Sequence, residues 1–115
     1  FTRAKSFDTF APCGPWLTTA DEIPNPENLK LTTKVNGELR QNSSTKNMYI
    51  KPYEIISKLS NSMTLEKGDI ISTGTPSGVV LNNPKLEFLK DGDEIEMEIE
   101  NIGILKNTVK IIKNS

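Results

Sequence analysis

The clearest pattern in the chain is the alternation of apolar and polar residues in residues 29–35. Leucine, threonine and valine at the odd positions alternate with lysine and threonine at the even ones, the period of a half-buried β-strand. Asn36 and Gly37 follow, a pair that suits a tight hairpin turn in which both central residues need a positive φ. Residues 38–42 supply the returning strand. This part of the sequence therefore predicts a β-hairpin.

A second alternation covers residues 94–100, where Ile95, Met97 and Ile99 alternate with four glutamates. Successive glutamates on one face of a strand stand roughly 6.6–6.8 Å apart, which is long for sharing one metal ion. We therefore interpret them as a solvated face of a strand. Residues 104–112 predict a last strand, joined to this one by a short turn.

The remaining regular elements are one helix and two short strands. Residues 50–62 place apolar side chains at helical spacing, and Pro52 stands where a first turn accepts proline. Residues 68–72 and 16–19 are predicted as strands. The total is six or seven short strands and one helix, so we predict a mainly β fold with residues 1–115 forming a single domain.

A hydroxyl-rich loop follows the strand predicted at 68–72. Ser72, Thr73 and Thr75 place three hydroxyl groups within four positions. Gly74 and Gly78 lack a Cβ and let the backbone approach a ligand closely. Hydroxyl and free N–H groups at the end of a strand can hold a carboxylate or a phosphate. An ordinary turn between two strands explains the same residues, and both interpretations stay open at this stage.

Composition excludes some classes of function. The formal net charge of −1 argues against nucleic-acid and anionic-membrane partners, which require basic surface. No apolar run approaches the length of a membrane span. The chain has no histidine and one cysteine, Cys13. We expect Cys13 to pack as a small apolar residue instead of acting as a nucleophile, and the lack of a disulfide framework leads us to expect a cytoplasmic protein.

Several motifs together resemble the C-terminal half of the fumarylacetoacetate hydrolase family, which includes acylpyruvases, oxaloacetate decarboxylases and hydroxyheptadienedioate isomerases. The resemblance covers nearly the whole chain. In chain order, the motifs are AKSFDTFAPCGPW at 4–16, VNGELRQ at 35–41, LEKGDII at 65–71, TGTPSGV at 73–79 and GDEI at 92–95.

The resemblance implies part of a mixed β-sandwich roll and a homodimer. It implies chemistry on small 2-oxo acids, in which a divalent ion (Mg²⁺, or Mn²⁺ or Ca²⁺) stabilises an enolate. It assigns Lys5 to the active site, where its ammonium group would stabilise oxyanion charge, although the local sequence alone favours an exposed surface lysine. Thr75, with Gly74, would hold the substrate carboxylate. Lys5 and Thr9 would lie beside a second cation, and Gln41 would be structural.

The sequence also departs from the family. The metal-binding triad of two glutamates and an aspartate lies upstream of the Lys5 segment in relatives, as does the Glu–His pair of the hydrolases, and Val80 replaces a common glycine. We therefore expect no metal site in this chain, and we expect residues 1–115 to be the C-terminal part of a longer catalytic domain. Two hypotheses follow: a piece of a metal-dependent 2-oxo-acid enzyme that is inactive alone, or a non-catalytic binding or assembly module.

Overall fold

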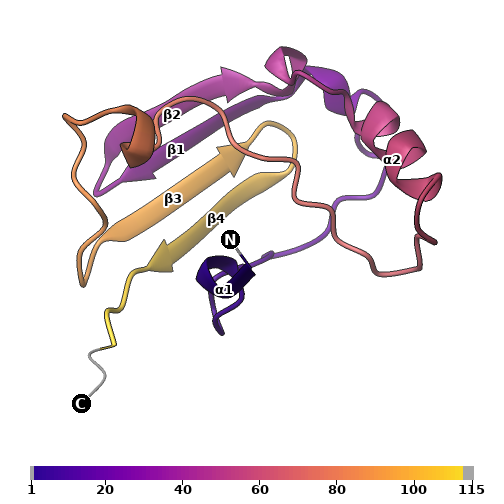
Figure 1. Cartoon of the computed structure of the whole chain (residues 1–115). Helices are drawn as coiled ribbons and strands as arrows, with labels where there is room; N and C mark the ends of the chain where they lie inside the picture. The colour runs from indigo at the N-terminus through magenta and orange to yellow at the C-terminus, as the bar shows by residue number, and fades with distance from the viewer. Residues whose placement is uncertain (1, 113–115) are drawn as a thin grey trace.

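The computed structural model describes residues 2–112, and its centre is one four-stranded antiparallel sheet (Figure 1). The order of the strands across the sheet is β2-β1-β3-β4. The strands are β1 (Lys30–Val35), β2 (Glu38–Ser44), β3 (Glu94–Ile99) and β4 (Gly103–Thr108).

The β1–β2 hairpin confirms the prediction made from residues 29–42. Asn36 and Gly37 form its turn with φ values of 51° and 80°, as a type I′ turn requires. The register then shifts, because Thr33 pairs with Gln41 whereas the next residue of β1 pairs with Leu39. Arg40 is the extra residue of this β-bulge, and a bulge redirects the side chains around it.

The two faces of the sheet differ in character. The inner face, as we call it, carries the odd-numbered residues of β1 and β3, including Val35 and Ile95. The outer face carries a row of paired charges, in which Glu96 lies between Lys34 at 3.1 Å and Lys106 at 4.0 Å. The glutamates of β3 therefore lie on a charged outer face, as the alternation predicted.

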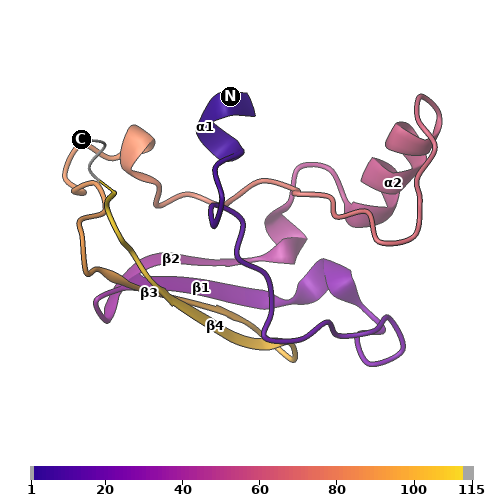
Figure 2. The same cartoon turned by 90° about the horizontal axis from the view of Figure 1, so that it is seen from below.

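Helices α1 and α2 and the long connection between α2 and β3 lie on one side of the sheet, as the view along its edge shows (Figure 2). The main helix, α2 (Pro52–Ser60), confirms the predicted helix and begins at proline. A second helix, α1 (Thr2–Lys5), has only four residues. Three short 3₁₀ helices complete the elements: η1 (Pro26–Asn28), η2 (Thr45–Asn47) and η3 (Val80–Asn82).

Two strand predictions are wrong. Residues 68–72 form no regular element and join no sheet, and Ile70 is 78% exposed. Residues 16–19 likewise form no strand. A strand needs a neighbour to satisfy its backbone groups, and neither segment has one among residues 2–112. Within residues 2–112 the sheet has four strands, whereas the sequence predicted six or seven. Strand β4 ends at Thr108 instead of the predicted Ile112.

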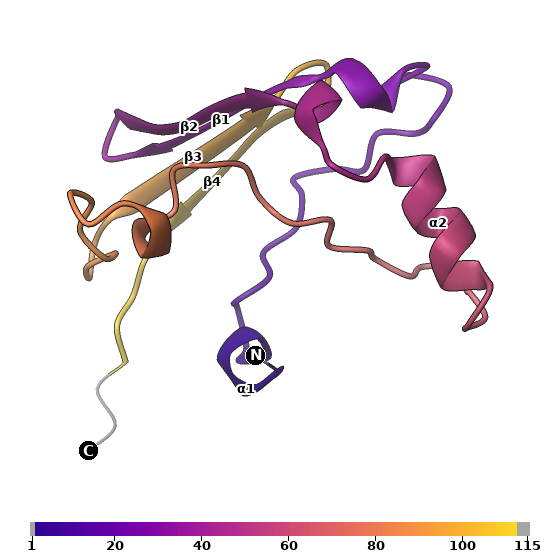
Figure 3. The same ribbon diagram turned by 45° about the horizontal axis from the view of Figure 1, so that its top comes forward.

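Few side chains of the described chain are buried. Within residues 2–112, only Ile23 and Leu29 are buried, at 8% and 6% exposed, whereas aromatic residues such as Trp16 and Tyr53 are more than half exposed. Cys13 is also exposed, which corrects the expectation that it packs as an apolar residue. It belongs to the irregular segment between α1 and the sheet (Figure 3), and its own neighbours in that segment, residues 6–13, are exposed as well.

Candidate functional site

A groove of about 260 Å³ opens between one end of the inner face and the segment 75–89. The sheet forms its floor, and the long connection between α2 and β3 forms its wall. Its lining combines apolar and polar side chains: Thr33, Val35, Asn36, Arg40, Gln41, Thr75, Gly78, Val79, Val80, Leu86, Glu87, Phe88, Leu89, Asp93 and Ile95. The hydroxyl-rich loop that drew attention in the sequence therefore borders a concave surface.

The side chain of Gln41 joins this loop to the sheet. Its Nε2 donates to the hydroxyl of Thr75 at 2.8 Å and to the carbonyl of Pro76 at 3.1 Å. Its Oε1 accepts a hydrogen bond of 2.9 Å from the hydroxyl of Thr33 on β1. Gln41 thus has the structural role expected of it, and it fixes the position of Thr75.

Gly78 brings the same loop into direct contact with β2. A Cβ at Gly78 would stand 2.1 Å from the carbonyl oxygen of Arg40, and the residue has a φ of 107°. Only glycine can lie this close to another backbone in this conformation. The loop is therefore attached to β2 at two neighbouring points, Gln41 and Arg40.

Arg40 is the one cationic residue that lines the groove in the described part of the chain. Its side chain is 18% exposed, and one terminal nitrogen lies 3.3 Å from a carboxylate oxygen of Glu38. Its Nε is buried without a hydrogen-bond partner within residues 2–112. No local sequence pattern marks Arg40 as a groove residue, because its inward position depends on the bulge in β2.

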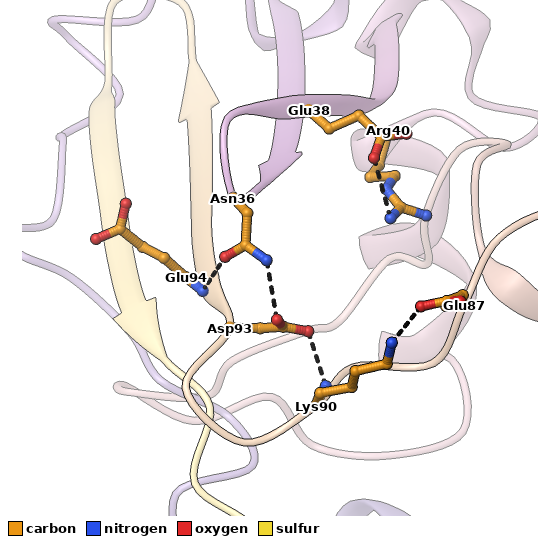
Figure 4. A network of polar contacts seen from close by, with 7 residues as sticks. All are labelled: Asn36, Glu38, Arg40, Glu87, Lys90, Asp93 and Glu94. Atoms are coloured by element: carbon orange, nitrogen blue, oxygen red, sulfur yellow. Dashed lines mark hydrogen bonds and ion pairs between the residues drawn. The ribbon is translucent and has the colours of Figure 1, made fainter.

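A polar network closes the far end of the groove (Figure 4). The Asn36 side chain donates to Asp93 Oδ1 at 2.9 Å, and its oxygen accepts from the backbone N–H of Glu94 at 2.9 Å. The backbone N–H of Lys90 donates to Asp93 Oδ2 at 2.7 Å. The hydrogen bond from the Lys90 backbone has the largest effect on the Asp93 carboxyl and lowers its pKa, and the hydrogen bond from the Asn36 side chain lowers that pKa further. The Lys90 side chain pairs with Glu87, which lowers the pKa of the Glu87 carboxyl.

Thr75 and Gly74 offer the groups that an anion requires. Both residues are exposed, and Gly74 has a φ of 96° with open space where a Cβ would stand. No hydrogen bond among residues 2–112 uses the backbone N–H of either residue. One hydroxyl at the edge of the groove and the N–H groups of Thr75 and its neighbour Gly74 are thus available.

No described hydrogen bond or ion pair joins Lys5 or Thr9 to this loop. Lys5 ends α1 and is exposed, and Thr9 follows in a turn with a φ of 68°. Within residues 2–112, no hydrogen bond or ion pair involves the side chain of Lys5 or of Thr9.

The described residues do not fit a divalent metal ion. No group of three or more histidine, cysteine, aspartate or glutamate residues within 2–112 is arranged to hold one. Two acids of β3 pair with lysines on the outer face: Glu94 lies 2.8 Å from Lys106, and Glu96 lies 3.1 Å from Lys34.

The fold matches solved structures of hydrolases and isomerases. The fumarylacetoacetate hydrolase from psychrophilic Exiguobacterium antarcticum has a TM-score of 0.89 and 47% identity, over 94% of this chain and 39% of that one. Maleylpyruvate hydrolase from Sphingobium sp. SYK-6, in complex with manganese(II) ion and pyruvate, has a TM-score of 0.81 and 39% identity, over 90% of this chain and 37% of that one.

Residues 1–110 match the family described as fumarylacetoacetate (FAA) hydrolase C-terminal, and the chain belongs to that family. It is 50% identical over 105 residues to a mitochondrial oxaloacetate tautomerase of Bos taurus, which covers 91% of this chain and 33% of the relative. An uncharacterized protein of Archaeoglobus fulgidus is 51% identical over 112 residues, 96% of this chain and 41% of the relative. The chain therefore spans about a third to two fifths of the length of these relatives. Within residues 2–112, no helix combines the length and the apolar character needed to cross a membrane.

Proposed function

We propose that this chain is the C-terminal part of a longer catalytic domain that acts on a small 2-oxo acid, and that it supplies the group that holds the substrate carboxylate. The supporting relatives are an oxaloacetate tautomerase and a maleylpyruvate hydrolase that was crystallised with pyruvate. Oxaloacetate, maleylpyruvate and pyruvate all carry a carboxylate next to a carbonyl group. The proposed reaction is acylpyruvate hydrolysis, oxaloacetate decarboxylation or hydroxyheptadienedioate isomerisation.

The observation that carries the proposal is the position of Thr75. Its hydroxyl borders the groove, and hydrogen bonds from Gln41 to Thr75 and Pro76 hold its loop against the sheet. The N–H groups of Gly74 and Thr75 make no hydrogen bond in the described chain. A fixed hydroxyl beside free N–H groups suits an anion, because a hydrogen bond to a charged acceptor is stronger than one to a neutral acceptor.

Lys5 has the second role in the proposal. Its ammonium group would lie where negative charge develops on the substrate oxygen, and a fixed cation there lowers the barrier of the chemical step. Thr9 would lie beside Lys5 near a second cation. A second copy of the chain is the expected partner, as in the homodimers implied by the resemblance. We place the protein in the cytoplasm, although the bovine tautomerase is mitochondrial.

The role of this chain does not depend on which metal the whole protein uses. Mn²⁺ accompanies pyruvate in the maleylpyruvate hydrolase structure, and Mg²⁺ or Ca²⁺ is the other candidate. Residues 2–112 do not fit such an ion, so the proposal gives this chain the binding of the carboxylate and the placement of Lys5 only.

The experiment is a set of activity assays on the full-length protein with oxaloacetate, an acylpyruvate and hydroxyheptadienedioate. The proposal predicts turnover of at least one of these, and a Lys5→Met variant should lose about a hundredfold in kcat, the typical effect of removing one group that stabilises an oxyanion. Arg3→Met, in the same short helix, is the matched control and should retain activity. If the full-length protein turns over none of the three, a non-catalytic binding or assembly module becomes the better description.

A further inference from the structure

The surroundings of Gln41 determine which way its side-chain amide points. One terminal atom of the amide lies 3.1 Å from the carbonyl oxygen of Pro76, and a carbonyl can only accept a hydrogen bond. That atom must therefore be the nitrogen. The other terminal atom is then the oxygen, and it accepts from the hydroxyl of Thr33 at 2.9 Å.

This orientation also determines the direction of the hydrogen bond to Thr75. The amide nitrogen has two hydrogens, so one goes to Pro76 and the other to the Thr75 hydroxyl oxygen, 2.8 Å away. A hydroxyl carries a single hydrogen of its own. Because the Thr75 oxygen already accepts from Gln41, that hydrogen points elsewhere, and no group within residues 2–112 receives it.

We propose that Gln41 is a positioning residue that makes the hydroxyl of Thr75 a hydrogen-bond donor toward a carboxylate in the groove. Gln41 does not touch the ligand. It occupies a lone pair of Thr75, so that the hydroxyl presents its hydrogen to the anion and not its lone pairs. The hydrogen bonds then all run in one direction: the Thr33 hydroxyl on the sheet donates to Gln41, and Gln41 donates to the Thr75 hydroxyl. This inference rests on the proposed binding of a 2-oxo acid carboxylate at Thr75.

The test reverses the direction of that hydrogen bond at nearly constant side-chain size. In Gln41→Glu, an ionised carboxylate can only accept, so it draws the Thr75 hydrogen to itself and leaves lone pairs facing the ligand. The affinity of the full-length protein for pyruvate, measured by calorimetric titration, should fall about ten- to a hundredfold, the range for a hydrogen bond to a charged partner.

A double-mutant cycle with Thr75→Val separates this effect from general damage to the loop. If Gln41 acts through the hydroxyl, Gln41→Glu should add little in a Thr75→Val background, because the hydroxyl is already absent. If the two losses simply multiply, Gln41→Glu acts through the displaced loop or through its own charge, and the inference is wrong.

The pH dependence of pyruvate binding gives a readout that a purely structural role would not change. Lowering the pH from 8 to 5 should restore affinity in Gln41→Glu, because the introduced carboxyl, half-buried, becomes protonated and can donate again. The charged groups facing this position are Arg40 and Glu38 on β2 and Glu87 and Asp93 across the groove. The pKa values of Glu87 and Asp93 are lowered, so both stay ionised over this range.

The outcomes separate the two proposals. If Thr75→Val leaves pyruvate affinity unchanged, the proposed carboxylate site itself fails. If Thr75→Val weakens binding while Gln41→Glu does not, the site stands and the role of Gln41 is refuted. Melting temperatures show whether each variant folds. Should Gln41→Glu not fold, Gln41→Met, which cannot donate but is similar in size, takes its place in the cycle, and strict additivity with Thr75→Val would overturn the inference.

Discussion

Trp16 lies directly on Gly103, although the two residues are far apart in the chain. A Cβ at Gly103 would stand 2.6 Å from Cζ2 of the indole, and the indole nitrogen donates to the carbonyl of Ile102 at 2.7 Å. The contact attaches the N-terminal segment, which carries Lys5, to the turn between β3 and β4. The absence of a side chain at Gly103, the first residue of β4, therefore leaves the room in which the indole packs.

Replacing Gly103 with alanine should release this attachment. The indole cannot rotate away without losing its hydrogen bond to Ile102, so the new methyl group should lower the free energy of unfolding of the full-length protein by about 1–3 kcal/mol. Gly92→Ala is the control, since Gly92 has a φ of 86° but open space at its Cβ. Urea denaturation measures both variants. Equal losses in the two would show that backbone strain alone, and not the Trp16 contact, explains the effect.

Gly78→Ala should weaken ligand binding from outside the carboxylate site. The new Cβ would meet the carbonyl oxygen of Arg40 at 2.1 Å, and a backbone atom cannot move aside as a side chain can. The loop should lift from β2 and break the hydrogen bond from Gln41 to Thr75, and pyruvate affinity should drop about tenfold. Gly68→Ala has similar strain, with a φ of 96° and no close neighbour, and should retain affinity. A loss of affinity as large in Gly68→Ala would contradict this account.

The elements that the sequence predicted correctly are those with a local cause. The Asn36–Gly37 turn depends on the two residues that form it, and the alternation in β3 depends on which side chains avoid water. Residues 68–72 have the β-branched composition of a strand but no neighbouring strand among the described residues, and composition does not reveal whether a partner exists.

The candidate site was predictable only in part. The hydroxyl and glycine pattern marked Thr75 and Gly74, and the motif resemblance gave them a role. The contact of Gln41 with Thr75 was not predictable, because it depends on the bulge that shifts the register of β2 at Arg40. The contact between Trp16 and Gly103 joins distant segments, which only the three-dimensional arrangement brings together.

The stability of the protein in acid should depend on Asp93. Hydrogen bonds from the Lys90 backbone and the Asn36 side chain lower the pKa of its carboxyl. Its stabilising contribution is therefore complete above the ordinary aspartate pKa of about 3.9 and is lost as the pH falls through the lower value of the folded state. Thermal denaturation between pH 6 and 3 should show a shallower decline for Asp93→Asn than for the natural protein. Parallel declines would contradict this assignment.

The exposed apolar residues should become buried in the full-length protein. Ile70 is 78% exposed among residues 2–112, and we expect the remainder of the catalytic domain to cover it. Ile70→Asp should therefore destabilise the full-length protein by more than about 2 kcal/mol, since an unpaired charge is costly to bury. In the isolated 115-residue chain the same change should have little effect. Lys67→Asp, in the same segment, should be neutral in both, and an equally neutral Ile70→Asp in the full-length protein would count against the proposal.

The central claim is that Thr75 holds the carboxylate of a small 2-oxo acid. Calorimetric titration of the full-length protein with pyruvate, at fixed pH and fixed divalent metal concentration, tests it most directly. Thr75→Val preserves the shape of the side chain and removes its hydroxyl, so pyruvate affinity should fall about ten- to a hundredfold while the melting temperature changes little. Unchanged affinity in a well-folded Thr75→Val protein would contradict the account.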